Sequence, residues 1–393
     1  MPRTQRKIPS THKSSLLKIG LVLDDSLDKP DGVQQYVLGI GAWLSAQGHE
    51  VHYLVGKTTR RDVAHIHSLS RNVSVRFNGN RMSPPLPTSH RLLRELLARE
   101  QYDILHVQMP YSPWLAHRLI QAAGPRTAII GTFHIVAYSK LVHMATRALA
   151  IWTRQSSRRF DRVFSVSTAA EAYARATYGL TTTVLPNVID YERFHAAQSI
   201  DRAGTVLQLL FLGRLVPRKG CQLLLAAIAI LAATRPNVPN FKVLICGKGP
   251  LAEQLKDYAR RHGIADRVEF VGFVSEADKP RYYASADIAV FPSSGGESFG
   301  IVLIEAMASG KAAVLAGDNS GYRSVLYERP DLLFDPKDAL ALAAKIKTYL
   351  VDADGRRATA AWGEAYSRQF DTAVVGTKLV AAYNQALQKR RSR

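Results

Sequence analysis

The chain has 393 residues, 47% hydrophobic and 21% charged, and its 52 Lys and Arg against 32 Asp and Glu give a formal net charge of +20. This length predicts two domains of ordinary size, and the composition excludes a disordered or fibrous protein. The absence of any apolar run of 18 residues excludes a membrane-spanning helix, and two cysteines are too few for a disulfide framework.

The strong positive charge suits a polyanionic partner, either nucleic acid or an anionic lipid surface. No nucleic-acid-binding motif is present, so nucleic acid is not expected; an anionic membrane surface stays open as the partner, as does charge that only keeps the protein soluble. Residues 1–17 are basic and predicted to be disordered, and no apolar stretch follows them as it would in a secretory signal. The cysteine content fits a reducing compartment, which predicts a cytoplasmic protein, peripheral on the cytosolic face of a membrane.

Alternating strands and helices predict an α/β fold with two doubly wound Rossmann-like domains that face each other across a cleft. The N-terminal domain is predicted over residues 18–186 and the C-terminal domain over 187–370, with a hinge at 186–190. A basic helix is expected over 371–393. Strands are predicted at 18–23, 51–55, 103–107, 127–131 and 162–166, and then at 206–212, 241–246, 268–271, 287–291 and 312–315.

Ligands bind beyond the carboxyl ends of such strands, so the loops there carry the candidate residues. After the first strand, Gly32 and Gln34 begin a predicted helix whose N-terminus suits a phosphate or a sugar, and Asp31 before them is a good helix cap. His106 and Gln108 end another strand and are further candidate ligand residues.

In the second half, Gly213, Arg214 and Lys219 follow a buried strand. Cations in such a loop suit a diphosphate, whereas the alternative is an exposed basic loop in which Arg218 is only a surface residue. Two further readings stay open for 246–252, where Gly247 and Gly249 follow the next strand: backbone contact with a nucleotide, or a tight turn.

Segment 291–310 is the most informative in the chain. It reads as the end of a strand, a loop with Gly295 and Gly296, and a helix whose N-terminus can accept phosphate. Glu297 lies in the loop and Glu305 lies inside the helix, up to about 12 Å away. Glu305 is surrounded by apolar residues, which predicts a partner or a function for its carboxylate.

This segment resembles the Glu-x7-Glu motif of retaining glycosyltransferases of family 4, which have the GT-B fold. Residues 295–305 are most similar to the phosphatidylinositol mannosyltransferase branch, and the resemblance runs from about 18 to 368. It implies transfer of a hexose from a nucleoside diphosphate sugar, with GDP-mannose favoured, to a membrane lipid, without a bound metal or cofactor. It also implies that the C-terminal helices cross back onto the first domain. By the same resemblance, Glu297, His134, Arg214 and Lys219 serve catalysis, and Gly32, Gln34, Asn187, Gly213, Gly247, Gly249, Ser298, Phe299, Gly300, Ile301 and Glu305 join the charged residues at the donor.

One departure from the family concerns the loop before the first helix, where Asp31 replaces the first residue of a Gly-Gly-Val-Gln run. Two basic segments, 89–99 and 140–162, are amphipathic and suit either a membrane surface or an ordinary solvated helix face. The pair Asp352 and Asp354 lies in a polar turn, so no metal is expected there. The residues predicted to face the membrane or the acceptor are Arg91, Arg94, His106, Gln108, Lys140, Arg147 and Arg154.

Three alternatives remain at this stage. In the first, the protein is a glycosyltransferase whose donor is a UDP-hexose and whose acceptor is a glycolipid or polysaccharide precursor. In the second, it binds sugar nucleotides without catalysis. In the third, it is a nicotinamide-dependent oxidoreductase. The last is disfavoured because the glycine motif follows the second strand of its domain rather than the first.

Overall fold

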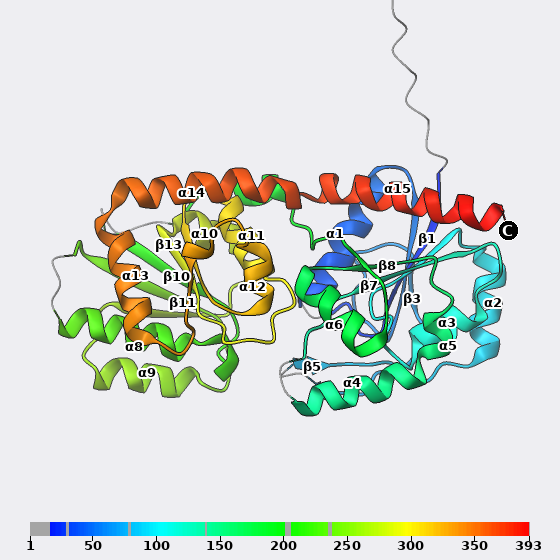
Figure 1. Cartoon of the computed structure of the whole chain (residues 1–393), viewed down its shortest axis with the longest axis horizontal. Coiled ribbons are helices and arrows are strands. Elements are labelled where there is room, and N and C mark those ends of the chain that lie inside the picture. Colours follow the sequence, from blue (N-terminus) through cyan, green and yellow to red (C-terminus); the bar gives the residue numbers. More distant parts are fainter. Residues whose placement is uncertain are drawn as a thin grey trace, which may run out of the picture.

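The computed structural model of the protein describes residues 16–28, 31–77, 80–137, 140–200, 206–234 and 238–392. Figure 1 shows two α/β units side by side, each built around a parallel sheet. The predicted class, two doubly wound Rossmann-like units, is confirmed. The basic segment 1–15 lies outside the described residues.

The sheet of the first unit has the strand order β3-β2-β1-β6-β7-β8-β9, with parallel pairing throughout. β1 is central and almost completely buried, as its apolar run predicts for a strand covered on both faces. The order reverses at β1, which places a ligand-binding crevice at its carboxyl end. The elements are β1 (Lys18–Leu23), α1 (Gly32–Ala46), β2 (Glu50–Val55), β3 (Ile66–Ser68), α2 (His90–Glu100), β6 (Ile104–Val107), α3 (Leu115–Ala122), β7 (Ala128–Phe133), α4 (Lys140–Trp152), α5 (Arg154–Ser157), β8 (Arg162–Ser165), α6 (Thr168–Tyr178) and β9 (Thr183–Val184).

The second sheet has the order β12-β11-β10-β13-β14-β15, again all parallel, with its reversal at β10. The loops after β10 and β13 therefore share the crevice of this unit. Its elements are α7 (Tyr191–His195), β10 (Leu207–Leu212), η1 (Pro217–Lys219), α8 (Cys221–Ala233), β11 (Phe241–Cys246), α9 (Ala252–Arg261), β12 (Val268–Gly272), α10 (Lys279–Ser285), β13 (Ile288–Phe291), α11 (Ile301–Ala308), β14 (Ala313–Gly317), α12 (Ser320–Val325), η2 (Pro330–Leu332), β15 (Leu333–Phe334), α13 (Ala339–Val351), α14 (Ala353–Ser367) and η3 (Arg368–Phe370).

The last helix, α15 (Thr372–Arg391), lies against the first unit, where it contacts α1 and β7. In Figure 1, α14 and α15 follow one another along the same side of both units. Tyr383 Oη lies 2.7 Å from His106 Nδ1, and Arg390 Nε donates to Asp161 at 2.7 Å. These contacts join the end of the chain to the core of the first unit.

The two units also meet beside their crevices. Ser167 Oγ, at the start of α6, donates to the backbone carbonyl of Ser298. A Cβ added at Gly32 would lie 3.1 Å from Cδ1 of Ile301, the first residue of α11. The N-termini of α1 and α11 therefore approach each other, and both offer unpaired N–H groups.

Sequence reasoning missed the short strands at the edges of the two large sheets and a separate two-stranded sheet. These are β3, β9, β15 and the antiparallel pair β4 (Val75–Phe77) and β5 (Asn80–Met82). Two or three residues are too few for a hydrophobic period to be recognised.

Candidate active site

The loop between β13 and α11 holds Glu297 in a cluster of cations. Its Oε1 lies 2.8 Å from Lys219 Nζ and 2.8 Å from Arg218 Nη1, and it accepts a 2.7 Å hydrogen bond from Ser293 Oγ. Burial alone would raise the pKa of Glu297, but Lys219 and Arg218 lower it to about 2, so the side chain is a carboxylate at neutral pH. Burial lowers the pKa of Lys219, which Glu297 opposes. The ion pairs are thus well shielded from water.

The alternative in which Arg218 is only a surface residue is wrong, because Arg218 is 7% exposed. Its backbone carbonyl accepts a 2.9 Å hydrogen bond from Ser294 N, so the loop after β10 is tied to the loop after β13. Gly220 allows this approach, because its φ is +73° and an added Cβ would lie 2.0 Å from the carbonyl oxygen of Pro292.

Arg214 adds a third cation to the cluster. Burial lowers its pKa, and its charge interacts with Asp31, Arg218 and Glu297. The interaction with Asp31 spans the two units, since Asp31 precedes α1. Asp31 occupies the N-cap position without a side-chain capping bond, so the expectation that it caps the helix is wrong. Three cations against Glu297 and Asp31 leave an excess of positive charge between the units.

Gly247 and Gly249 serve the packing of neighbouring loops in this structure. An added Cβ would lie 1.8 Å from Gly213 O at the first position and 2.2 Å from Leu215 O at the second. The same loops exchange backbone hydrogen bonds from Gly213 to Cys246 and from Leu215 to Lys248. This geometry accounts for both glycines as a close turn, one of the two readings that the sequence left open.

Glu305 is buried in α11 and has the partner that its apolar surroundings predicted. Tyr283 Oη donates to it at 3.0 Å, and Lys279 Nζ lies 3.4 Å away. Lys279 also pairs with Glu276 at 2.8 Å. α10 therefore holds the carboxylate one turn inside α11, on the same helix whose N-terminus begins beside Glu297.

On the first unit, His134 follows β7 and is 8% exposed. Its Nε2 lies 3.0 Å from Gln108 Oε1, and the ring of Tyr36 packs edge-on against it at 5.2 Å. Burial lowers the pKa of His134 to about 3, so its imidazole is neutral at physiological pH. Tyr36 was missed by sequence reasoning, although it follows Gly32 by one helical turn on α1.

Two other predicted donor-binding residues, Gln34 and Asn187, are also buried. Gln34 is 3% exposed and donates from Nε2 to the carbonyl of Ser26 at 3.2 Å. Asn187 is 5% exposed, and its Oδ1 is buried without a hydrogen-bond partner in the described part of the chain. A buried acceptor without a donor is costly, so Asn187 is suited to a ligand that donates.

His106 was predicted to face the acceptor, and this is wrong. It is completely buried, with Nδ1 beside Tyr383 Oη and Nε2 beside Thr132 Oγ1, both at 2.7 Å. Both ring nitrogens are therefore occupied inside the first unit. Its function is to join α15 to β6 and β7.

Comparison with known proteins decides the family. The model described as Glycosyltransferase Family 4 matches residues 30–193, and the model described as Glycosyl transferases group 1 matches residues 193–365. The chain is 32% identical over 375 residues to the phosphatidyl-myo-inositol mannosyltransferase of Mycolicibacterium smegmatis, an alignment that covers 93% of each chain. The chain belongs to glycosyltransferase family 4.

Two further comparisons extend this result. The glycosyltransferase is 26% identical, over 89% of its length and 93% of the relative, to a GDP-mannose-dependent alpha-(1-6)-phosphatidylinositol monomannoside mannosyltransferase of Mycobacterium tuberculosis. Sucrose-phosphate synthase from Thermosynechococcus elongatus has the same fold, with a TM-score of 0.72, 22% identity, and coverage of 95% of this chain and all of the other. The GT-B fold and a hexosyltransferase activity are thereby established for this chain.

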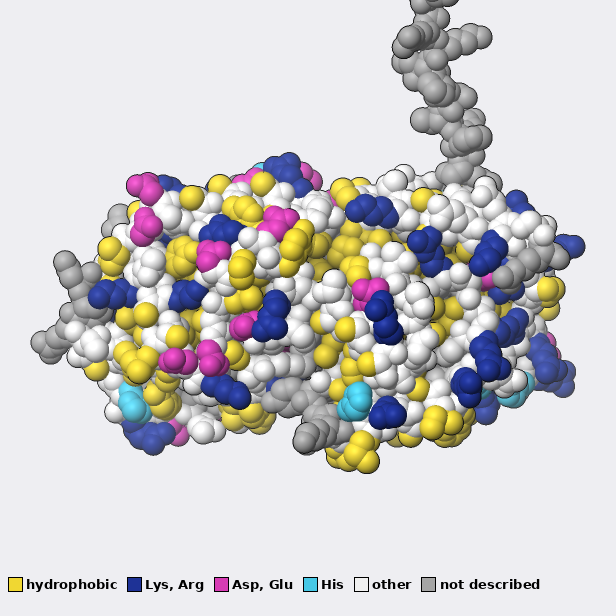
Figure 2. Space-filling model, in the orientation of Figure 1, with side chains coloured by type: hydrophobic (Ala, Val, Ile, Leu, Met, Phe, Trp, Pro, Cys, Tyr) yellow, Lys and Arg dark blue, Asp and Glu magenta, His cyan; other side chains and the backbone are white. Residues whose placement is uncertain are grey.

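The predicted membrane-facing segments lie on the outside of the first unit. On α4, four large apolar side chains are 64–80% exposed: Leu141, Met144, Ile151 and Trp152. Arg147 and Arg154 are exposed beside them, and Arg91 and Arg94 are exposed on α2. The side chain of Lys140 lies outside the described residues. Figure 2 shows hydrophobic side chains gathered along the lower edge of this unit, where Figure 1 places α4.

No helix in the described part of the glycosyltransferase is long and apolar enough to cross a membrane.

Asp352 caps α14 by accepting from Gly355 N at 2.8 Å, and Asp354 forms an ion pair with Arg357. Both acidic residues thus have structural partners.

Proposed function

We propose that this glycosyltransferase transfers mannose from GDP-mannose to a phosphatidylinositol-type lipid, with retention, on the cytosolic face of a membrane. The observation that carries the proposal is the cluster of Arg214, Arg218 and Lys219 around Glu297, in which Arg218 is buried and the other three side chains are partly buried. Its excess positive charge lies at the switch point of the second unit and suits the two phosphates of a nucleotide sugar. The donor and the acceptor are those named in two of its relatives.

The residues divide between the two halves of the donor. Arg214 and Lys219 are assigned to the diphosphate, with the N-terminus of α11 beside them as a further anion site. Glu305, held by Tyr283, is assigned to the ribose. Glu297 and the neutral His134 are assigned to the hexose. A carboxylate accepts from sugar hydroxyls, and Nδ1 of His134 can also accept from one, because its single N–H, on Nε2, is directed at Gln108 Oε1.

The proposed reaction needs no protein nucleophile. The bond between the anomeric carbon and the diphosphate oxygen breaks, and the acceptor hydroxyl forms its bond on the same face of the sugar. The acceptor proton passes to the departing diphosphate. Arg214 and Lys219 stabilise the negative charge that grows on the departing diphosphate. Stabilisation of developing charge by fixed groups is usually the largest single contribution to catalysis.

The lipid acceptor is supported by α4. Four large apolar side chains exposed on one helix, with arginines beside them, are unusual for a surface that meets only water. Such a helix suits the boundary between headgroups and acyl chains of an anionic membrane. We therefore assign α4 to reversible membrane binding, and α2, with Arg91 and Arg94, to a supporting electrostatic contact.

The test combines donor choice with product analysis. Thermal shifts with GDP, UDP and ADP and their common sugars, with NADH as control, should show stabilisation by GDP and GDP-mannose. Purified protein with GDP-mannose and phosphatidylinositol vesicles should then give an α-mannosyl lipid by NMR. Stabilisation by UDP-sugars alone would replace the donor with a UDP-hexose. Absence of any shift and of any transfer would favour a protein without catalytic activity.

A further inference from the structure

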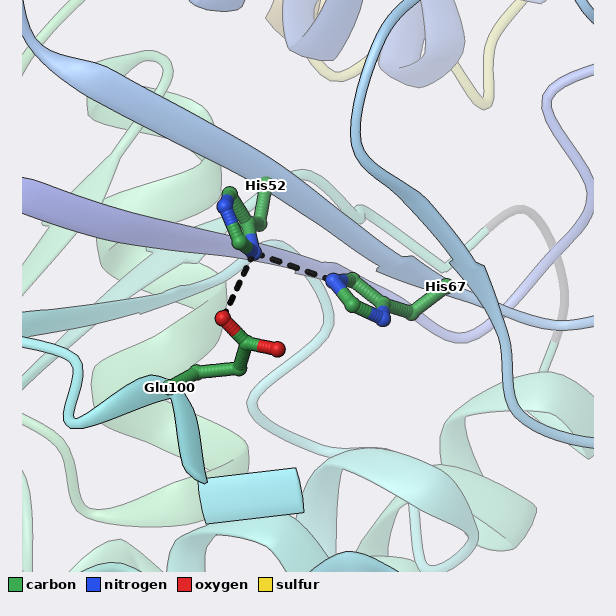
Figure 3. Close-up of side chains that lie close together, drawn as sticks. All are labelled: His52, His67 and Glu100. Carbon is green, nitrogen blue, oxygen red and sulfur yellow. Dashed lines mark hydrogen bonds and ion pairs between the residues drawn. The ribbon is translucent and has the colours of Figure 1, made fainter. Parts of the chain in front are cut away.

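Two histidines and a glutamate meet on the first unit, away from the candidate active site. His52 lies on β2, His67 on β3 and Glu100 at the end of α2 (Figure 3). In the parallel pairing of β2 and β3, His67 lies opposite Leu54. Leu54 is two residues after His52, so the side chains of His52 and His67 lie on the same face of the sheet. His52 is three residues before the carboxyl end of β2, whereas the active-site loops lie beyond the carboxyl ends of the strands.

The three side chains bring one ligand atom each to a common point. His52 Nδ1 lies 3.0 Å from His67 Nε2 and 3.8 Å from Glu100 Oε2, and all three ligand atoms lie within 4.8 Å of one another. Two ligands of a tetrahedral zinc ion, each about 2.1 Å from the metal, stand about 3.4 Å apart. The observed spacings lie on either side of this value, so small side-chain movements would suffice.

The hydrogen bonds around His52 set its tautomer. Its Nε2 lies 2.9 Å from Glu50 Oε1, and since a carboxylate only accepts, this nitrogen carries the proton. The Nδ1 lone pair is thereby directed at His67 and at Tyr102 Oη, which lies 2.9 Å away. A carboxylate that orients a histidine in this way is the usual outer support of a metal-binding imidazole.

The types of ligand atom also suit a transition metal. Two imidazole nitrogens and one carboxylate oxygen fit Zn²⁺, Co²⁺ or Ni²⁺ and not Mg²⁺ or Ca²⁺, which need oxygen ligands.

We propose that His52, His67 and Glu100 bind a single divalent transition-metal ion that fastens the end of α2 to β2 and β3. Glu50 is a positioning residue for His52. Lys18 Nζ lies 2.8 Å from Glu100 Oε2 and 2.9 Å from Glu50 Oε1. The ammonium group and the metal ion compete for the same carboxylate oxygen.

The experiment is a zinc titration of chelator-treated full-length protein in competition with a chromophoric chelator. Wild type should bind one equivalent, and His67→Ala should lose this binding. The matched control is His65→Ala, because His65 stacks on the His52 ring at 4.7 Å but is not one of the three ligands. It should bind zinc as wild type does. Glu50→Ala removes the acceptor of His52 Nε2 and should weaken binding by about 10–100-fold, as loss of an outer support does.

A second variant separates a metal site from a hydrogen-bonded network. Lys18→Met removes the competing ammonium and should tighten zinc binding by about tenfold, although it removes two ion pairs. Circular dichroism checks that each variant is folded, and His67→Gln replaces His67→Ala if that variant is not. No stoichiometric zinc binding by wild type, or equal binding by wild type and His67→Ala, would overturn the proposal.

Discussion

Replacing Lys219 by methionine removes one of the cations that surround Glu297 and keeps most of the side-chain volume. Lys219 Nζ lies 2.8 Å from Glu297 Oε1, and its side chain is 17% exposed. The carboxylate keeps Arg218 at 2.8 Å and Ser293 at 2.7 Å. The variant therefore loses a charge needed for the diphosphate but does not leave the carboxylate alone.

The size of the effect follows from this burial. Unit charges about 4 Å apart at an effective dielectric constant of about 20 interact by roughly 4 kcal/mol. Loss of one preorganised group that stabilises developing charge typically costs about 2.7–4 kcal/mol. We expect kcat/KM for transfer from GDP-mannose to fall by about 10²–10³. Removing one partner of a fully buried pair costs about 3–5 kcal/mol of stability, and because Glu297 keeps two partners we expect about 1–3 kcal/mol.

The assay measures mannose incorporation into phosphatidylinositol vesicles over a range of donor concentrations, together with the Tm of each variant. Lys219→Arg keeps the charge and should recover part of the activity. Lys256→Met is the matched control, since Lys256 is 41% exposed and pairs with Glu253 on α9; it should behave as wild type. If folded Lys219→Met keeps its kcat/KM within about twofold of wild type, the diphosphate assignment is refuted.

The remaining predictions concern the membrane, pH and packing. Ile151→Ser with Trp152→Ser, which replaces side chains 80% and 64% exposed on α4, should lower sedimentation with anionic vesicles by at least about tenfold, whereas Leu340→Ser, 68% exposed on the second unit, should not. The pKa of folded His134 is about 3, so as the pH falls from 6.5 to 3 the unfolded state takes up a proton that the folded state does not, and the free energy of unfolding decreases. In urea unfolding, His134→Gln should therefore lose about 2 kcal/mol less stability than wild type between pH 7 and pH 5. Equal losses for the two proteins would exclude this contribution. Gly249→Ala should lower the Tm by several degrees in a thermal melt, because its Cβ would meet a backbone carbonyl at 2.2 Å; an unchanged Tm would mean that the loops separate freely.

Most of the fold could be predicted from the sequence because its elements are local. Buried parallel strands are continuous apolar runs, and β11 and β13 occur where such runs predict them. The loop after β10 carries Arg214 and Lys219 and the loop after β13 carries Glu297, and they meet because a parallel sheet collects such loops at one edge. The burial of Glu305 was also legible, since its neighbours in α11 are apolar.

The roles of individual polar residues were harder to predict, because they depend on partners distant in the chain. His106 looked like a ligand residue at the end of a strand, but α15 covers it, and Tyr383 is 277 residues away in sequence. Arg218 looked like a surface residue, but the loop after β13 covers it and its guanidinium pairs with Glu297. Asp31 looked like a helix cap, but its charge interacts with Arg214 on the other unit.

The sequence by itself determined the two-unit α/β architecture, the glycosyltransferase family and the position of the charged loops, because periodicity, apolar runs and motifs are properties of short segments. Only the tertiary structure decided which side chains meet. The cluster of His52, His67 and Glu100 has no motif spacing, since its members come from two strands and the end of a helix. Packing of the sheet against α2 creates it, and contacts of this kind are set by the whole core and not by any one segment.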